Sequence, residues 1–407
     1  MNNHHPKKLL FITWDSDSTN YLESLFLPIL QGLQESGIVS CAILQFSWAA
    51  PDKIKQLKSL SEAQDIAYWH YPISRKPHPL LGSLWTVYKG RKIIKKLIKQ
   101  EGFQLLMPRS TMPAMMVNRL WRVLKRKEVK VLFDADGLPL EERLDFTALK
   151  SNDFQYKYLK RQETQMLQKA NKVLCRTQKA IDFHIPKVGE SRRRDFHWVS
   201  NGRDADRFTF STQDRERVRQ ALGIRETEKL WVYTGSLGPQ YALKEMLGIF
   251  ELYQTKQPNS RFLILVNHKE HLGHAIPKGL KDKLIFRSLP FQEIPAHLSA
   301  ADIAFSLRLP AWSMRGVAPI KLGEYLLMGL PVIASTGIGD TEILLQGLPF
   351  VHLYYHREKD RKERAVEWVK DLSTVDRQEI RDFALAHFSL NKSIAEYSKV
   401  INESLKE

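Results

Sequence analysis

Residues 318–341 read APIKLGEYLLMGLPVIASTGIGDT, and this stretch decides the fold. Pro319 can begin a helix in its first turn, residues 321–328 can continue it, and Gly329 can end it. Residues 331–334 follow as a short aliphatic run, which is typical of a buried strand. A helix that leads directly into a buried strand is the second half of a β-α-β unit, so the stretch predicts a parallel sheet.

The same alternation extends in both directions along the chain. Short aliphatic runs lie at residues 9–13, 42–46, 105–107, 129–133, 172–175 and 197–200. A second series lies at residues 230–234, 262–266, 284–287, 303–307, 331–334 and 350–353. Longer segments with helical spacing follow these runs. The pattern therefore predicts an α/β fold with two Rossmann-like, doubly wound lobes and a central cleft at the carboxyl ends of the strands.

The length of 407 residues agrees with two lobes, since a domain ordinarily has about 100 to 200 residues. The strand series restarts after residue 202, and we interpret the charged stretch 204–229 as the connection between the lobes. We predict a first lobe at residues 1–203, a second at 204–380, and a C-terminal helix at 381–407 that packs back toward the first lobe.

The composition is that of a folded protein, with 43% hydrophobic and 26% charged residues. No apolar run approaches the ~18 residues of a membrane-spanning helix, and we expect no secretory signal because the apolar run after residues 1–8 is too short. Cys41 and Cys175 are too few for a disulfide framework or a zinc site, so we expect a cytoplasmic location. The net charge of +17 favours anionic partners.

The helix of the opening stretch carries two charged side chains on one face. Lys321 and Glu324 are three residues apart, so a cation and a carboxylate lie side by side. The N-terminal amides of such a helix can bind a diphosphate, the lysine can contact phosphate, and the carboxylate can accept ribose hydroxyls. An ordinary surface pair of lysine and glutamate is the alternative.

The same stretch resembles the signature helix of family 4 nucleotide-sugar glycosyltransferases, which have the GT-B fold. The matching residues are Pro319, Lys321, Glu324, Tyr325, Leu326, Gly329, Pro331, Val332, Ile333 and Ala334. Residues 199–208, 232–237 and 298–303 are similar to three further boxes of that family, in the same order. The sequences GSLG at 235–238 and GIGD at 337–340 resemble a branch of bacterial surface-polysaccharide enzymes.

The resemblance implies that the second lobe binds a nucleoside-diphosphate sugar and the first lobe an acceptor. It implies retention of anomeric configuration, no obligatory metal, and no cofactor besides the donor substrate. The donor-binding residues that it implies are Gly235, Ser236, Asn267, Phe286, Ala318, Pro319, Ile320 and Glu324. Glu324 would hold the ribose, and Glu324→Ala should then weaken nucleotide binding without unfolding the protein.

The chain departs from the family at its phosphate-binding cations. Ser236 stands where the family has arginine, Tyr241 where it has lysine, and Gly316 where it often has a second glutamate. Other cations can take their place, because guanidinium groups match the geometry of phosphate oxygens. The candidate catalytic cations are Lys321, Arg308 and Arg315.

In the first lobe, polar residues follow two predicted strands. Asp15 and Ser16 follow the first strand, where the family has its acceptor loop, and a double N-cap of the next helix is the alternative. Asp134 and Asp136 follow a later strand, with Glu141 close behind. We predict that these carboxylates act as a base or orient the acceptor, and a simple turn at Asp136 is the alternative.

Residues 85–99 read WTVYKGRKIIKKLIK and predict a helix with an apolar face and a basic stripe. One interpretation is the solvated face of a core helix. The other is peripheral docking to the anionic inner face of the cytoplasmic membrane through Lys89 to Lys99, with Trp85 and Ile94 buried in the lipid interface. Nucleic acid is not an expected partner, because no binding module for it is recognisable.

The predicted function is transfer of a sugar from a nucleoside-diphosphate sugar to an acceptor hydroxyl, in the synthesis of cell-surface polysaccharide or glycolipid. Two alternatives remain. A nucleotide-sugar epimerase of the same fold would need no acceptor. A catalytically silent nucleotide-binding scaffold would account for Ser236, Tyr241 and Gly316.

Overall fold

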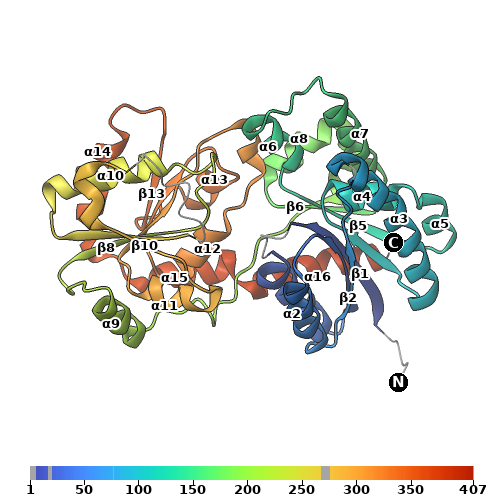
Figure 1. Cartoon of the computed structure of the whole chain (residues 1–407), viewed down its shortest axis with the longest axis horizontal. Helices are drawn as coiled ribbons and strands as arrows, with labels where there is room; N and C mark the ends of the chain where they lie inside the picture. The colour runs from blue at the N-terminus through green and yellow to red at the C-terminus, as the bar shows by residue number, and fades with distance from the viewer. Residues whose placement is uncertain (1–5, 17–20, 77, 267–275, 407) are drawn as a thin grey trace. The chain divides into compact units, whose positions relative to one another are not determined.

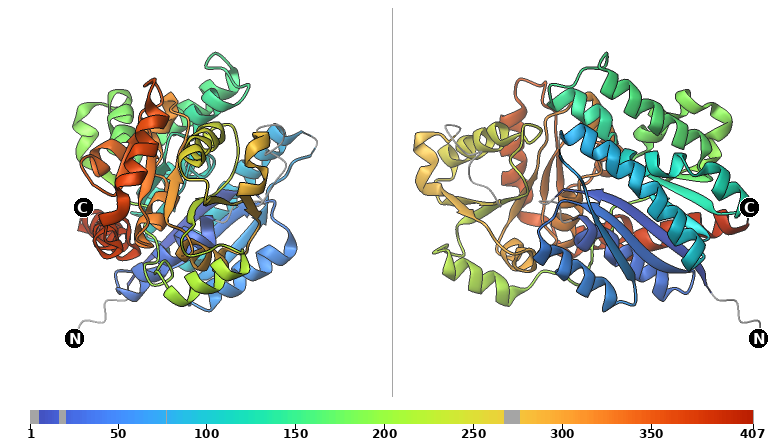
Figure 2. Two further views of the ribbon diagram at one scale, coloured as in Figure 1. Left: turned by 90° about the vertical axis from the view of Figure 1, so that its left-hand side faces the viewer. Right: turned by 45° about the vertical axis from the view of Figure 1, so that its right-hand side comes forward.

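The computed structural model describes residues 6–16, 21–76, 78–266 and 276–406, and the chain divides into two compact units (Figure 1). The first unit comprises Met1–Asn201 and Ser393–Glu407, and the second comprises Gly202–Lys392. Each unit contains one parallel sheet with helices on both of its faces (Figure 2). The predicted α/β architecture with two doubly wound sheets is confirmed.

The sheet of the first unit has seven strands in the order β3-β2-β1-β4-β5-β6-β7. The strands are β1 (Lys7–Asp15), β2 (Val39–Ser47), β3 (Ala67–Pro72), β4 (Leu105–Pro108), β5 (Lys130–Asp136), β6 (Lys172–Cys175) and β7 (Phe196–Trp198). The helices are η1 (Leu22–Phe26), α1 (Leu27–Glu35), α2 (Pro51–Glu62), α3 (Pro79–Glu101), α4 (Thr111–Asn118), α5 (Trp121–Arg126), α6 (Pro139–Phe146), α7 (Phe154–Lys169), α8 (Gln178–Val188) and η2 (Glu190–Asp195).

The sheet of the second unit has six strands in the order β10-β9-β8-β11-β12-β13. The strands are β8 (Lys229–Thr234), β9 (Ser260–Leu265), β10 (Leu284–Arg287), β11 (Ile303–Ser306), β12 (Val332–Ser335) and β13 (Val351–Tyr354). The helices are α9 (Thr212–Ala221), α10 (Leu243–Lys256), η4 (Lys278–Lys283), η5 (Phe291–Glu293), α11 (Ile294–Ser299), η6 (Trp312–Gly316), α12 (Ile320–Leu327), α13 (Thr341–Leu345), α14 (Arg361–Lys370), η7 (Asp371–Thr374), α15 (Arg377–Phe388) and α16 (Leu390–Lys406), which continues into the first unit.

The central strands of the second sheet, β9, β8, β11 and β12, are buried on both faces, which explains their continuous apolar runs. On β8, Leu230 and Val232 belong to one core cluster, whereas Trp231 and Tyr233 belong to another. The first cluster includes α9, α11, α12 and α15, and the second includes α10 and α14. Because successive side chains of a strand point to opposite faces, each strand joins the two helical layers.

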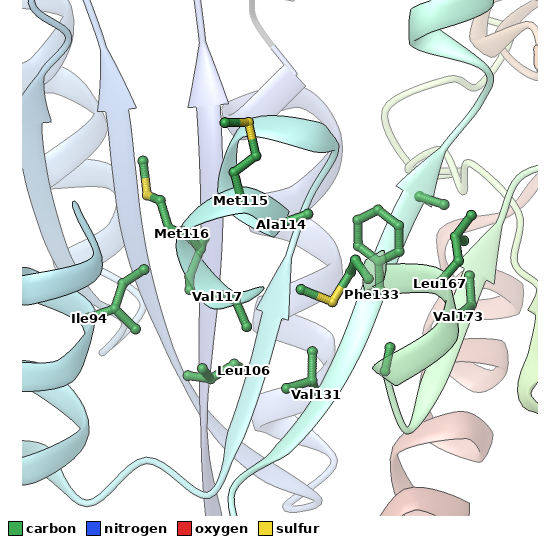
Figure 3. Packing of buried hydrophobic residues seen from close by; sticks show 14 of the residues in the cluster. Ile94, Leu106, Ala114, Met115, Met116, Val117, Val131, Phe133, Leu167 and Val173 are labelled. Atoms are coloured by element: carbon green, nitrogen blue, oxygen red, sulfur yellow. The ribbon is translucent and has the colours of Figure 1, made fainter. Parts of the chain in front are cut away.

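The core of the first unit is formed in the same way. Ile94 of α3 is fully buried, and Figure 3 shows it near Met116 and Val117 of α4 and Leu106 of β4. Residues 393–406 of α16 also belong to this unit, where Tyr397 accepts a hydrogen bond at 2.8 Å from Arg176. The hydrogen bond between Arg176 and Tyr397 joins α16 to the carboxyl end of β6.

Three local predictions differ from the structure. The sequence analysis missed β3, an edge strand with one buried, three half-buried and two exposed residues, whose sequence AYWHYP contains no aliphatic run. The stretch predicted as a connection contains α9, and the boundary between the units falls between Asn201 and Gly202. The predicted C-terminal helix is two helices, α15 and α16, which meet at Ser389.

Candidate functional site

The loops after three neighbouring strands of the second unit lie at one edge of its sheet. β8, β11 and β12 are adjacent and parallel, so their carboxyl ends lie side by side. The loop after β8 begins at Gly235, the loop after β11 contains Arg308 and leads to α12, and the loop after β12 contains Gly337. This edge therefore brings together segments about 100 residues apart in the sequence, as expected for a ligand site of this architecture.

The loop after β8 is held by its own strand. Gly235 has a φ angle of +147°, which side chains rarely tolerate, and a Cβ atom there would lie 3.0 Å from the Tyr233 hydroxyl. Tyr233 donates a hydrogen bond to the carbonyl of Ser236 at 2.5 Å. Burial raises the pKa of Tyr233, so its hydroxyl stays protonated and remains a donor. The backbone at Gly235 and Ser236 is thus fixed before any ligand binds.

Helix α12 is tied to the end of β8 by Tyr325. The fully buried Tyr325 hydroxyl accepts a hydrogen bond at 2.8 Å from the Thr234 amide, directly before Gly235. Gly329 ends the helix segment with a φ angle of +66°, and a Cβ atom there would meet the Arg377 carbonyl at 2.7 Å. Pro319 precedes the first helical residue, Ile320. The residues of the predicted signature therefore place the N-terminus of α12 relative to the β8 loop.

Lys321 and Glu324 form the predicted pair, with 2.8 Å between Nζ and Oε2. The pair is not an ordinary surface pair, because the Glu324 side chain is fully buried. Its other oxygen, Oε1, lies 2.8 Å from Nη2 of Arg203, which is 3% exposed. Sequence analysis did not assign Arg203 to the site. The sequence feature that could have indicated Arg203 is its place in the box at residues 199–208, which resembles a box of the glycosyltransferase family. Its partner Glu324 lies 121 positions later in the chain.

Aromatic rings enclose this group of charges. The Arg203 guanidinium lies 5.5 Å from the ring centroid of Phe208 and 5.7 Å from that of Phe291. The Lys321 ammonium lies 6.0 Å from the Phe291 ring. Glu324 is therefore an acceptor held between two cations, and a carboxylate has further lone pairs that can accept from hydroxyl groups. Lys321, whose side chain is 36% exposed, is the member of this group that water reaches.

Arg308 lies against the β8 loop, in which Ser236 and Tyr241 stand where the family resemblance implies an arginine and a lysine. Its guanidinium carbon is 4.7 Å from the ring centroid of Tyr241, and Nη2 is 3.5 Å from the Tyr241 hydroxyl. The two residues also form an isolated antiparallel bridge, and the Leu309 amide donates to the Gln240 carbonyl at 2.9 Å. A guanidinium thus stands beside Tyr241, the position at which the resemblance implies a lysine.

The other predicted donor-side residues lie in different surroundings. Arg315 is exposed on η6 with its guanidinium 5.6 Å from the Trp312 ring. Phe286 is half-buried on β10, an edge strand two places from β8. Ala318, Pro319 and Ile320 are half-buried at the start of α12. Asn267 lies outside the described residues.

In the first unit, Asp15, Asp134 and Asp136 share one ionic network. Arg109 lies 4.0 Å from Asp15 and 2.6 Å from Asp136, and Arg176 lies 2.6 Å from Asp134. These residues come from the ends of β1, β4, β5 and β6, which are neighbours in the sheet. The predicted convergence of the three aspartates is therefore present, with two arginines that the sequence analysis did not assign.

The members of this network differ in exposure. Asp134 is fully buried, and burial raises the pKa of its carboxyl, an effect that Arg176 opposes. Asp136 is 31% exposed and has a φ angle of +61°, a conformation that costs free energy in a residue with a side chain. Asp134 is thus placed to hold Arg176, whereas Asp136 is the carboxylate that solvent reaches. Ser16 is half-buried after β1.

Glu141 takes part in a different cluster. It is buried on α6, with its carboxylate 2.6 Å from the ammonium of Lys160 on α7 and 3.2 Å from the hydroxyl of Tyr156. Lys160 also pairs with the buried Glu163. These contacts join α6 to α7, so the geometry of Glu141 is that of a buried ion pair between helices. The structure does not place it in the network of Asp15, Asp134 and Asp136.

Helix α3 carries the predicted basic stripe. Lys89, Lys92 and the lysines at 95, 96 and 99 are exposed, and the exposed rings of Trp85 and Tyr88 stack with 5.6 Å between their centroids. The expectation that Ile94 enters a lipid interface is wrong, because Ile94 is fully buried in the core (Figure 3). Leu81, 56% exposed, extends the apolar surface instead. Within the described ranges, no helix combines the length and apolarity needed to cross a membrane.

Solved structures of glycosyltransferases have the same fold. A glycosyltransferase from Rickettsia africae ESF-5 matches with a TM-score of 0.73 and 15% identity, over 99% of this chain and 100% of the other. The Anabaena protein HepE in complex with UDP and glucose matches with a TM-score of 0.72 and 14% identity, over 98% and 100%. The lipopolysaccharide outer core galactosyltransferase WaaB matches with a TM-score of 0.64 and 13% identity, over 98% and 99%.

No protein-family model matches the sequence, and a comparison with curated proteins finds no match. At 13 to 15% identity, the structural likeness concerns the fold. The predicted GT-B fold, with one Rossmann-like sheet in each unit, is therefore confirmed. The likeness does not extend to the donor, the acceptor or the roles of individual residues.

Proposed function

We propose that this protein transfers a sugar from a nucleoside-diphosphate sugar to an acceptor hydroxyl. The observation that carries the proposal is the arrangement at one edge of the second sheet. There, Gly235 opens a preformed loop, Arg308 lies against that loop, and α12 presents Lys321 and Glu324. A cation beside a glycine loop suits phosphate, and a carboxylate held on a neighbouring helix suits ribose hydroxyls.

In this proposal, the bond between the sugar and the diphosphate breaks, the acceptor oxygen bonds to the sugar carbon, and the proton of the acceptor hydroxyl passes to an acceptor-side carboxylate. Negative charge therefore develops on the leaving diphosphate. Arg308, Lys321 and the N-terminal amides of α12 near Ala318 and Ile320 stabilise that charge, and groups fixed before the reaction do so most effectively. Arg315, which is exposed, can add to this positive set. Glu324 binds the ribose.

We propose Asp136 as the acceptor-side carboxylate, because it is the partly exposed member of the network in the first unit. Asp134 then acts through Arg176 and keeps the ends of β5 and β6 in place. The resemblance to family 4 enzymes supports retention of configuration, and Gly235 to Gly238 supports a role in surface-polysaccharide or glycolipid synthesis.

The proposed acceptor is carried by a lipid, and α3 is the surface proposed to contact the membrane. Leu81, Trp85 and Tyr88 form an exposed apolar strip, and exposed lysines continue the same helix toward Lys99. Basic residues near an anionic surface contribute ~1 kcal/mol each, and aromatic rings favour the interface. A peripheral position at the inner face of the cytoplasmic membrane follows from this proposal.

A panel of nucleotides and nucleotide sugars tests the donor class. Thermal shift with UDP, GDP, ADP and their sugar derivatives should show stabilisation by one base, and Arg308→Ala should reduce it. Product analysis with the chosen donor then separates the alternatives. Conversion of the donor without an acceptor would indicate an epimerase, and binding without turnover against a pool of lipid-linked glycans would indicate a scaffold. Absence of stabilisation by every compound would contradict the proposal.

A further inference from the structure

The carboxyl ends of β11, β12 and β13 are joined by one side chain. Ser335, the last residue of β12, is 1% exposed, and its Oγ accepts a hydrogen bond from the Arg308 amide at 2.9 Å. The same Oγ lies 2.8 Å from Nε2 of His356, two residues beyond β13. The backbone ladder between β11 and β12 ends at Ser306 and Ala334, so the Ser335 side chain continues it to Arg308.

The second hydrogen bond can run in either direction, depending on the tautomer of His356. A serine hydroxyl has one proton and two acceptor lone pairs, so the Oγ of Ser335 can accept from the Arg308 amide in both cases. Among the contacts of the described residues, Nε2 of His356 is the acceptor available to the Ser335 proton. When Ser335 donates to it, the imidazole is neutral and carries its own proton on Nδ1.

Arg308 is held on its other side by the β8 loop. The antiparallel bridge to Tyr241 and the bond from the Leu309 amide to the Gln240 carbonyl fix its backbone there. The guanidinium then stacks on the Tyr241 ring at 4.7 Å. The position of Arg308 is therefore set by contacts to two loops, and Ser335 and His356 supply the contact on the β12 and β13 side.

We propose that Ser335 and His356 are positioning residues that hold Arg308 in place to bind the donor diphosphate. The inference rests on the proposed function, since it takes the diphosphate as the ligand of Arg308. Neither residue needs to touch the donor. Each acts on the backbone of Arg308, and the geometry makes donor binding depend on the protonation of His356.

Several groups face the His356 ring. Burial lowers its pKa, Glu245 on α10 and hydrogen bonding to the Arg308 backbone oppose this shift, and Arg361 on α14 adds to it. The Tyr354 ring meets the imidazole edge to face at 4.9 Å. The net effect lowers the pKa of His356, which favours the neutral imidazole whose Nε2 can accept from Ser335. Protonation at lower pH would place a proton on Nε2, which could then no longer accept from Ser335.

The positioning role is tested by measuring the affinity for UDP by calorimetry at pH 7.5. If the thermal-shift panel selects another base, GDP or ADP replaces UDP. Ser335→Ala and His356→Leu should each weaken binding by about fivefold to tenfold, the loss expected from one hydrogen bond. His356→Gln should retain the affinity, because a glutamine amide oxygen can accept from Ser335. His352→Gln is the matched control, since His352 is on β13 and its ring lies 5.6 Å from that of Trp368 instead.

Two further measurements separate positioning from a general loss of structure. In an Arg308→Ala background, Ser335→Ala should have no further effect on affinity, because the group that it positions is absent. Affinity of the wild-type chain should fall as the pH is lowered through the pKa of His356, and His356→Gln should flatten that profile. Nitrogen NMR of labelled histidines, assigned with His356→Gln, should show the Nδ1-protonated tautomer.

The outcomes are distinguishable. A wild-type chain that binds none of the three nucleotides overturns the proposed function, and the inference falls with it. Folded Ser335→Ala and His356→Leu variants that bind as tightly as the wild-type chain overturn the positioning role alone. The Nε2-protonated tautomer of His356, or an equal effect of Ser335→Ala with and without Arg308, also overturns it.

Discussion

Glu324→Ala should strongly destabilise the second unit. A ribose-binding carboxylate at the protein surface could be removed at little cost to folding, but Glu324 is buried. Arg203 and Glu324 are 3% and 0% exposed, and their charged atoms lie 2.8 Å apart. Removing the carboxylate leaves the Arg203 charge buried without it, and breaking a buried pair in this way costs ~3 to 5 kcal/mol. The structure therefore changes the expectation that Glu324→Ala affects nucleotide binding alone.

Urea unfolding followed by circular dichroism measures this cost, and a double-mutant cycle with Arg203→Met assigns it to the pair. Because Arg203→Met removes the charge that Glu324→Ala leaves behind, the double variant should be more stable than the sum of the single losses predicts. Glu324→Gln keeps the shape and an acceptor, so it should cost less. A Glu324→Ala loss below ~1 kcal/mol, or strictly additive losses, would refute the buried-pair reasoning.

Three further predictions concern the site, the pH dependence and the membrane. Lys321→Ala should lower kcat more than it raises KM, with a loss of ~2 to 4 kcal/mol in transition-state stabilisation; unchanged kcat/KM would remove Lys321 from the site. Burial, reinforced by Arg364, lowers the pKa of His352 to about 4, so its contribution to stability is complete above pH 6.5 and is lost as the pH falls toward 4. His352→Gln should therefore lose ~1 to 2 kcal/mol less unfolding free energy on acidification than the wild-type chain, a figure reduced for the solvent that reaches the ring. Identical dependence of unfolding free energy on pH in the two chains would contradict this. Replacing Lys92, Lys95 and Lys96 by Glu should abolish binding to anionic vesicles at low salt. The same change of charge at three exposed lysines elsewhere, Lys55, Lys58 and Lys281, should leave that binding intact. If the wild-type chain binds neutral vesicles as well as anionic ones, the electrostatic part of the proposal is wrong.

The sequence predicted the strands well wherever two helical layers cover the sheet. Trp231 and Val232 face different cores, so the run from Leu230 to Thr234 has to be apolar throughout and is easy to recognise. The edge strand β3 was missed for the converse reason. Its run from Tyr68 to Tyr71 reads YWHY, with one buried and three half-buried residues, and it lacks the aliphatic residues by which the other strands were recognised.

The site was predicted where it is local and missed where it depends on strand order. Lys321 and Glu324 are neighbours on one helix, so spacing alone places them together. Arg203 reaches Glu324 only because the second unit folds around both residues, and no local rule relates positions 203 and 324. Arg308 was a candidate from its cationic side chain, but its contact with Tyr241 requires β8 and β11 to be adjacent.

The placement of Arg308 bears most directly on whether the departures at Ser236 and Tyr241 mean a lost activity or an altered site. The Arg308 amide donates to the buried Ser335, which in turn contacts His356, so the backbone of this arginine is held in place beside the glycine loop. Tyr241 contributes as well, since its ring lies against the guanidinium. The geometry therefore favours an altered phosphate site, in which a cation from the loop after β11 takes the place of cations from the loop after β8.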